Sequence, residues 1–143
     1  MDSSRTIDHR NWVVLSAVVF VAILWNALTA PPQEARAPVR ELTVAEAKAA
    51  IDAGAAVIDV RDATVAATSH VNGALLIPLE VLHSKLPALE AYRARDIVVY
   101  CGDGSTRGPD ATALLNKEGF PQAANMAHGI QGWRAAGLPT TGV

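Results

Sequence analysis

Cysteine is almost absent from this sequence: among its 143 residues, Cys101 stands alone. A lone cysteine excludes an intramolecular disulfide framework. The four histidines are scattered and lack the spacing of a zinc site, so no metal site is expected. Basic blocks are also missing. The formal net charge is −2 and no interleaved basic and aromatic pattern occurs, which argues against nucleic acid as a partner.

Long apolar runs are confined to one place, residues 12–30. As a helix rising ~1.5 Å per residue, this segment would span about 28 Å, close to the hydrocarbon thickness of a bilayer. Trp12 and Trp25 lie toward its two ends, where membrane interfaces favour aromatic rings. We predict a transmembrane signal anchor at 12–30, preceded by an N-terminal tail at 1–11. A cleaved signal peptide is the alternative.

The charges around this segment bear on its orientation. Arg5 and Arg10 precede it, whereas Arg36 and Arg40 follow it, so the arginine counts on the two sides balance. The short basic tail favours a cytoplasmic N-terminus. This orientation predicts a single-pass protein of the bacterial inner membrane with a periplasmic domain.

The rest of the chain divides into a linker and one domain. Residues 31–39 are proline-rich and without periodicity, which predicts an extended linker, and residues 40–143 suffice for one core. Apolar strands and helical patterns alternate in this domain, which indicates an α/β fold with a parallel sheet covered on both faces. Strands are predicted at 56–60, 74–78, 96–101 and 123–126, and helices after a capping box at 43–46, near 79–86 and 88–94, over 108–119 and around Trp133.

Cys101 ends the most apolar strand and precedes a glycine-rich loop, "CGDGSTRG". This order places the thiol at the carboxyl edge of a parallel sheet, where α/β proteins bind ligands. Gly102 and Gly104 let backbone amides converge, and the helix that begins near Pro109 adds its N-terminus, so the loop can form an anion-binding nest. Because the nest and the guanidinium of Arg107 both favour a thiolate, we interpret Cys101 as a nucleophile.

Four segments resemble the rhodanese homology domain, in the right order. They are "VIDVRD" (57–62), "SHVNGALLIP" (69–78), "YCGDGSTRG" (100–108) and "HGIQGWRAAGLPT" (128–140). The resemblance covers essentially all of residues 40–143. It implies a rhodanese-like domain with a central parallel sheet of about five strands flanked by helices. It also implies an active-site cysteine that carries a persulfide.

The resemblance also implies roles for residues. Cys101 would be the sulfur-carrying nucleophile, and Arg107 would close the catalytic loop. Asp59 and Arg61 match a "DVR" turn near this loop, where they would support the site or serve only as a turn cap and salt bridge. The backbone of the intervening residues would form the substrate cradle: Gly102, Asp103, Gly104, Ser105 and Thr106.

The length of the loop leaves alternatives open. Five residues separate Cys101 from Arg107, whereas single-domain sulfurtransferases of the family usually have four. The longer loop resembles the Cys-x5-Arg ring of rhodanese-fold phosphatases and arsenate reductases, which holds a tetrahedral oxyanion. Asp103 would oppose such an oxyanion with its own charge. A membrane-tethered binding module without catalysis is the second alternative.

A rhodanese-type sulfurtransferase is therefore the predicted function. Cys101 would take sulfane sulfur from thiosulfate or a thiol persulfide and pass it to cyanide, a thiol or a protein acceptor. The acidic Asp103 predicts that thiosulfate is the poorer donor. This chemistry requires no metal or organic cofactor, and the N-terminal helix would attach the enzyme to the membrane.

Overall fold

A computed structural model describes residues 38–143 of the chain. The predicted tail at 1–11, the predicted transmembrane helix at 12–30 and most of the predicted linker at 31–39 lie outside these residues. Within 38–143, no helix is both long and apolar enough to cross a membrane.

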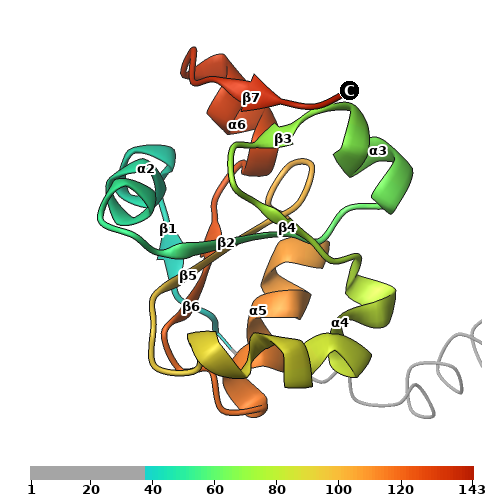
Figure 1. Ribbon diagram of the computed structural model, residues 1–143. Coiled ribbons are helices and arrows are strands. Elements are labelled where there is room, and N and C mark those ends of the chain that lie inside the picture. Colours follow the sequence, from blue (N-terminus) through green and yellow to red (C-terminus); the bar gives the residue numbers. More distant parts are fainter. Residues whose placement is uncertain (1–37) are drawn as a thin grey trace, which may run out of the picture. The chain divides into compact units, whose positions relative to one another are not determined.

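A sheet of five parallel strands forms the centre of the domain (Figure 1). The strand order is β1-β6-β5-β2-β4. In chain order the strands are β1 (Glu41–Leu42), β2 (Ala56–Asp59), β4 (Leu75–Leu76), β5 (Ile97–Tyr100) and β6 (Ala123–Met126). The prediction of a parallel α/β sheet is confirmed. The apolar run at β5 takes the central position, where all four residues are buried.

Helices cover both faces of this sheet (Figure 1). On one face lie α2 (Val44–Asp52) and α6 (Gly129–Ala135), whose apolar residues pack in one core cluster. On the other lie α4 (Leu79–Lys85), the 3-10 helix η1 (Leu86–Tyr92) and α5 (Arg107–Lys117). These helices confirm the predicted ones in order and position. Because helices cover both faces, the central strands of this sheet are largely apolar on both sides.

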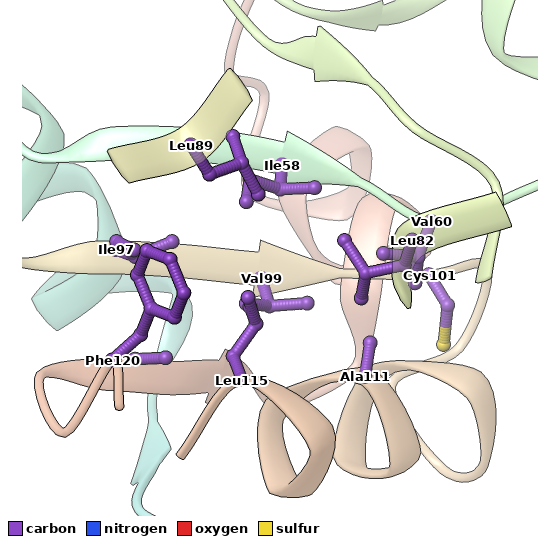
Figure 2. Packing of buried hydrophobic residues seen from close by; sticks show 11 residues of the cluster. Ile58, Val60, Leu82, Leu89, Ile97, Val99, Cys101, Ala111, Leu115 and Phe120 are labelled. Atoms are coloured by element: carbon purple, nitrogen blue, oxygen red, sulfur yellow. The ribbon is translucent and has the colours of Figure 1, made fainter. Parts of the chain in front are cut away.

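Successive residues of the central strands point to opposite faces, as the pleat requires. Val57 and Val98 belong to the cluster under α2 and α6, whereas Ile58 and Val99 belong to the cluster under α4 and α5. Figure 2 shows the second cluster, with Cys101 at its end beside the start of α5. Strand β5, which contributes residues to both clusters, thus places the Cys101 thiol at the carboxyl end of the sheet.

The start of α2 is determined by local sequence. The Thr43 hydroxyl accepts a hydrogen bond from the Glu46 amide at 3.2 Å, and the Glu46 carboxylate accepts one from the Thr43 amide at 2.8 Å. The predicted capping box is confirmed. The helix ends just before Gly54, whose φ of 98° is the left-handed conformation that glycine adopts without strain.

Several short elements do not follow from the sequence pattern. They include β1, the helix α3 (Ala63–Thr68), and the strands β3 (His70–Val71) and β7 (Thr140–Thr141), which pair antiparallel in a second small sheet. Two residues are too few for a period-two pattern. These strands depend on their partners in space rather than on local sequence.

A buried ion pair connects the end of β2 to its surroundings. Arg61 donates to Asp59 through Nη2 at 2.6 Å and through Nε at 3.0 Å, and its backbone amide also donates to Asp59 at 3.0 Å. The same guanidinium donates to the Ser69 carbonyl at 2.7 Å and lies 5.9 Å from the centre of the Tyr100 ring. Asp59 is fully buried. The turn cap and salt bridge expected of these two residues are both present.

Replacing Asp59 by Asn should destabilise the domain by about 3 kcal/mol, because the buried Arg61 guanidinium would lose its compensating charge. The exposed pair between Lys48 and Asp52 provides a matched control. Asp52→Asn should cost under about 0.5 kcal/mol. Urea unfolding of both variants measures the difference. Equal losses would show that the buried pair contributes no more than the exposed one.

Candidate active site

Cys101 follows β5 directly, at the carboxyl end of the central strand. Cys101 is only 2% exposed and lines an open pocket of about 310 Å³. Around it, the pocket is lined by Arg61, Asp62, Val65, Gly102, Asp103, Thr106, Arg107 and Gln131. The sulfur thus lies where the sheet edge, the loop and the end of β2 meet.

The loop that follows presents one backbone amide directly to the sulfur. Gly104 N–H donates to Cys101 Sγ at 3.2 Å. The loop then enters α5 at Arg107, an 11-residue helix whose N-terminus carries partial positive charge. Both features can stabilise negative charge that develops on the Cys101 sulfur during a reaction. The arrangement therefore fits a nucleophilic thiolate or a persulfide anion.

Asp103 occupies part of the expected cradle. Its Oδ1 accepts the Ser105 amide at 3.0 Å and lies 3.8 Å from Cys101 Sγ, within reach of a thiol proton. The hydrogen bond from the Ser105 amide is the main reason that the pKa of Asp103 is lowered. The carboxylate is consequently charged at neutral pH. The Ser105 amide, which the sequence predicts to be part of the substrate cradle, thus binds the Asp103 carboxylate instead.

The side chain of Arg107 makes its polar contacts with segments outside the loop. Its Nη2 donates to both carboxylate oxygens of Glu80, at 2.5 and 2.6 Å, and lies 3.6 Å from Asp62. Its Nε donates to the Val60 carbonyl at 3.3 Å. Arg107 therefore lines the pocket while tying α5 to α4 and to the end of β2. Its expected role in closing the loop remains a prediction.

The structure brings only some of the predicted site residues together in the Cys101 pocket. Cys101, Gly102, Asp103, Thr106 and Arg107 share one pocket with Arg61. The remaining predicted residues, Gly104, Ser105 and Asp59, are not among those that line it. Gly104 instead donates its amide to the sulfur, and the buried Asp59 binds Arg61. Among residues 38–143, no three His, Cys, Asp or Glu side chains gather as a metal site.

Sequence reasoning missed Asn125, a fully buried residue of β6. Its Nδ2 donates to the Gly104 carbonyl at 3.0 Å and to the Glu41 carboxylate at 2.8 Å. A Cβ at Gly108 would come 2.1 Å from its Oδ1 and 3.5 Å from Cys101 Sγ, so glycine is required there. The only sequence signal was a polar residue in an otherwise apolar strand. Asn125 holds the middle of the loop against the sheet.

The loop also lies against the start of α6. The amides of Ile130 and Gln131 donate to the carbonyls of Cys101 and Gly102, each at 3.0 Å. Gly104, at a φ of 78°, approaches the backbone of residues 126–129 so closely that a Cβ would come 2.5 Å from the His128 nitrogen. The conformation of the loop is therefore set by segments distant in sequence.

A family model for the rhodanese-like domain matches residues 43–136, which include the loop, Asn125 and most of the sheet. The chain belongs to the rhodanese-like family. Its fold is accordingly a rhodanese-like α/β fold with a five-stranded parallel sheet.

Rhodanese-like relatives of this chain include sulfurtransferases. Over 78 residues it is 36% identical to the probable adenylyltransferase/sulfurtransferase MoeZ of Mycobacterium tuberculosis, a match of 54% of this chain and 20% of MoeZ. Over 89 residues it is 30% identical to the thiosulfate sulfurtransferase GlpE of Pseudomonas fluorescens, a match of 62% of this chain and 79% of GlpE. The crystal structure of the Alr3790 protein from Anabaena sp. is 30% identical, with a TM-score of 0.65 over 71% of this chain and 80% of that one.

Gly104→Ala should destabilise the domain by about 3 kcal/mol, because the new Cβ adds a backbone clash to the strain of a positive φ. Gly73 is the matched control: its φ is 76°, and nothing lies within 4 Å of a Cβ built there. Gly73→Ala should cost about 1 kcal/mol. Urea unfolding measures the loss of stability in both variants. The rate of alkylation of Cys101 reports whether the loop beside the sulfur has moved. Equal stability losses and an unchanged alkylation rate for Gly104→Ala would contradict the close approach.

Proposed function

We propose that this rhodanese-like protein is a sulfurtransferase in which Cys101 carries sulfane sulfur as a persulfide. The observation that carries the proposal is the Gly104 amide at 3.2 Å from Cys101 Sγ, in a pocket open to small molecules. Sulfurtransferases of this family use small sulfur donors and acceptors, and relatives with that name support the same reaction class.

The reaction has two displacement steps. In the first, the Cys101 thiolate attacks the outer sulfur of the donor, an S–S bond forms, and the bond inside the donor breaks. The electron pair leaves with sulfite or with a thiolate. In the second step, cyanide, a thiol or a protein acceptor attacks the outer sulfur of the persulfide, and the Cys101 thiolate leaves. The Gly104 amide would stabilise the negative sulfur before and after each step.

Oxyanion chemistry, as in a rhodanese-fold phosphatase or arsenate reductase, receives less support from the site. A tetrahedral oxyanion requires free amides and a guanidinium pointed at the position where charge develops. Here the Ser105 amide binds Asp103, and the Arg107 guanidinium binds both oxygens of Glu80. A non-catalytic binding module would leave unexplained why a lone cysteine lies in the pocket with an amide directed at its sulfur.

Substituting Cys101 by Ser should reduce thiocyanate formation from cyanide and a sulfane donor to the uncatalysed rate, because a serine oxygen cannot carry sulfane sulfur. The full-length chain is assayed in detergent with thiosulfate and with 2-hydroxyethyl persulfide, and far-UV circular dichroism establishes that the variant is folded. Retained turnover in Cys101→Ser would contradict the proposal. Hydrolysis of a phosphate ester without thiocyanate formation would instead support the phosphatase alternative.

Residues 12–30 form, in this proposal, a single-pass anchor in the bacterial inner membrane with the domain on the periplasmic side. The apolar length of the segment and the basic tail before it support this placement. Fusions of alkaline phosphatase and of green fluorescent protein to the C-terminus test it. The phosphatase fusion should be active and the fluorescent fusion dark. The opposite pair of results would place the domain in the cytoplasm.

A further inference from the structure

Two carboxylates and two guanidinium groups line the Cys101 pocket, and a third carboxylate binds one of the guanidinium groups. Three carboxylates, here called the rim carboxylates, lie at or beside it: Asp62, Glu80 and Asp103. Two guanidinium groups line it, those of Arg61 and Arg107. An anionic donor would need these arginines to be available.

Both arginines are already bound to other groups of the protein. Arg61 is bound to the fully buried Asp59 at 2.6 Å and to the Ser69 carbonyl at 2.7 Å. Arg107 is bound to both oxygens of Glu80 and lies 3.6 Å from Asp62. Both positive charges are therefore compensated within the protein, and the charge of Asp103 remains beside the sulfur.

Asp103 also lies close to the reactive sulfur. Its Oδ1 is 3.8 Å from Cys101 Sγ and accepts the Ser105 amide at 3.0 Å. A negatively charged group attached to the transferred sulfur would have to displace this carboxylate or remain next to it. The lowered pKa of Asp103 keeps it ionised under ordinary conditions.

We propose that Asp103 determines donor specificity, so that the site favours persulfides on neutral or amine-bearing carriers over thiosulfate and carboxylate-bearing persulfides. This inference rests on the proposed sulfur transfer. An ammonium group on the carrier would face the rim carboxylates as a counter-ion, whereas the sulfite end of thiosulfate would face them as a like charge. Thiosulfate, the donor in the name of GlpE, would then not be the preferred donor of the present chain.

The step is the same for each donor and differs only in the charge of its leaving group. The Cys101 thiolate attacks the outer sulfur of R–S–SH, the new S–S bond forms at Sγ, and the bond between the two donor sulfurs breaks. The electron pair leaves as R–S⁻, which takes up a proton from water. With thiosulfate the same displacement releases sulfite, with two negative charges, past Asp103.

A charge series of matched donors tests the proposal: 2-aminoethyl, 2-hydroxyethyl and 2-carboxyethyl persulfides, together with thiosulfate. The second-order rate of Cys101 loading is measured on the full-length chain by rapid quench and intact mass. Each rate is divided by the rate of the same donor with a neutral small thiol, which removes differences in intrinsic reactivity. The aminoethyl donor should exceed the carboxyethyl donor by about tenfold, and the ratio should fall with added salt.

Asp103→Asn isolates the carboxylate, because the amide oxygen of asparagine can still accept the Ser105 amide. This variant should lower the aminoethyl to carboxyethyl ratio at least about fivefold and should raise loading by thiosulfate. Asp96→Asn is the matched control: it removes the same charge from an exposed residue that immediately precedes β5, at the other end of the strand from Cys101. It should leave the ratio as in the unaltered protein.

The outcomes separate the two proposals. A ratio near one in the unaltered protein, or a ratio unchanged by Asp103→Asn, would overturn the role of Asp103 while leaving sulfur transfer intact. An equal fall in the ratio for Asp96→Asn would assign the effect to the net charge of the protein and would also overturn the role of Asp103. Loading of Cys101 by none of the four donors would overturn the sulfurtransferase proposal itself.

Discussion

The contact between the loop after Cys101 and the start of α6 is the constraint on which the site depends. Two amides of α6 bind the carbonyls of Cys101 and Gly102 at 3.0 Å, and Gly104 lies directly against the backbone of residues 126–129. These contacts fix the loop from outside, because glycine-rich loops have little preference of their own. The Gly104 amide consequently points at the sulfur, and the loop presents Asp103 to the pocket.

Charge compensation follows from the same arrangement. With the loop fixed, α5 begins at Arg107, and the Arg107 guanidinium binds Glu80 on α4. The pocket consequently combines a sulfur supported by one amide with arginines that are already paired. A site of this kind is better suited to sulfane sulfur, which is small and needs few hydrogen bonds, than to a tetrahedral dianion, which needs many.

Local features of this fold were predictable from sequence, whereas contacts between distant segments were not. The capping box at Thr43 and the apolar run at β5 depend on adjacent residues, and both appear as predicted. The position of Cys101 at a sheet edge followed from the strand–loop–helix order. The direction of Arg107 depends on Glu80, which is 27 residues away, and the support of the loop depends on Asn125, 21 residues from Gly104. No pattern within either segment reveals these partners.

Intact mass spectrometry of the full-length protein tests directly whether Cys101 accepts and releases sulfane sulfur. After exposure to 2-aminoethyl persulfide, we predict a gain of one sulfur atom, located on the peptide that contains Cys101 and lost when cyanide is added. Because Cys101 is the only cysteine, no other thiol can account for the gain. A protein whose mass remains unchanged after this treatment, although its thiol can still be alkylated, would contradict this role of Cys101.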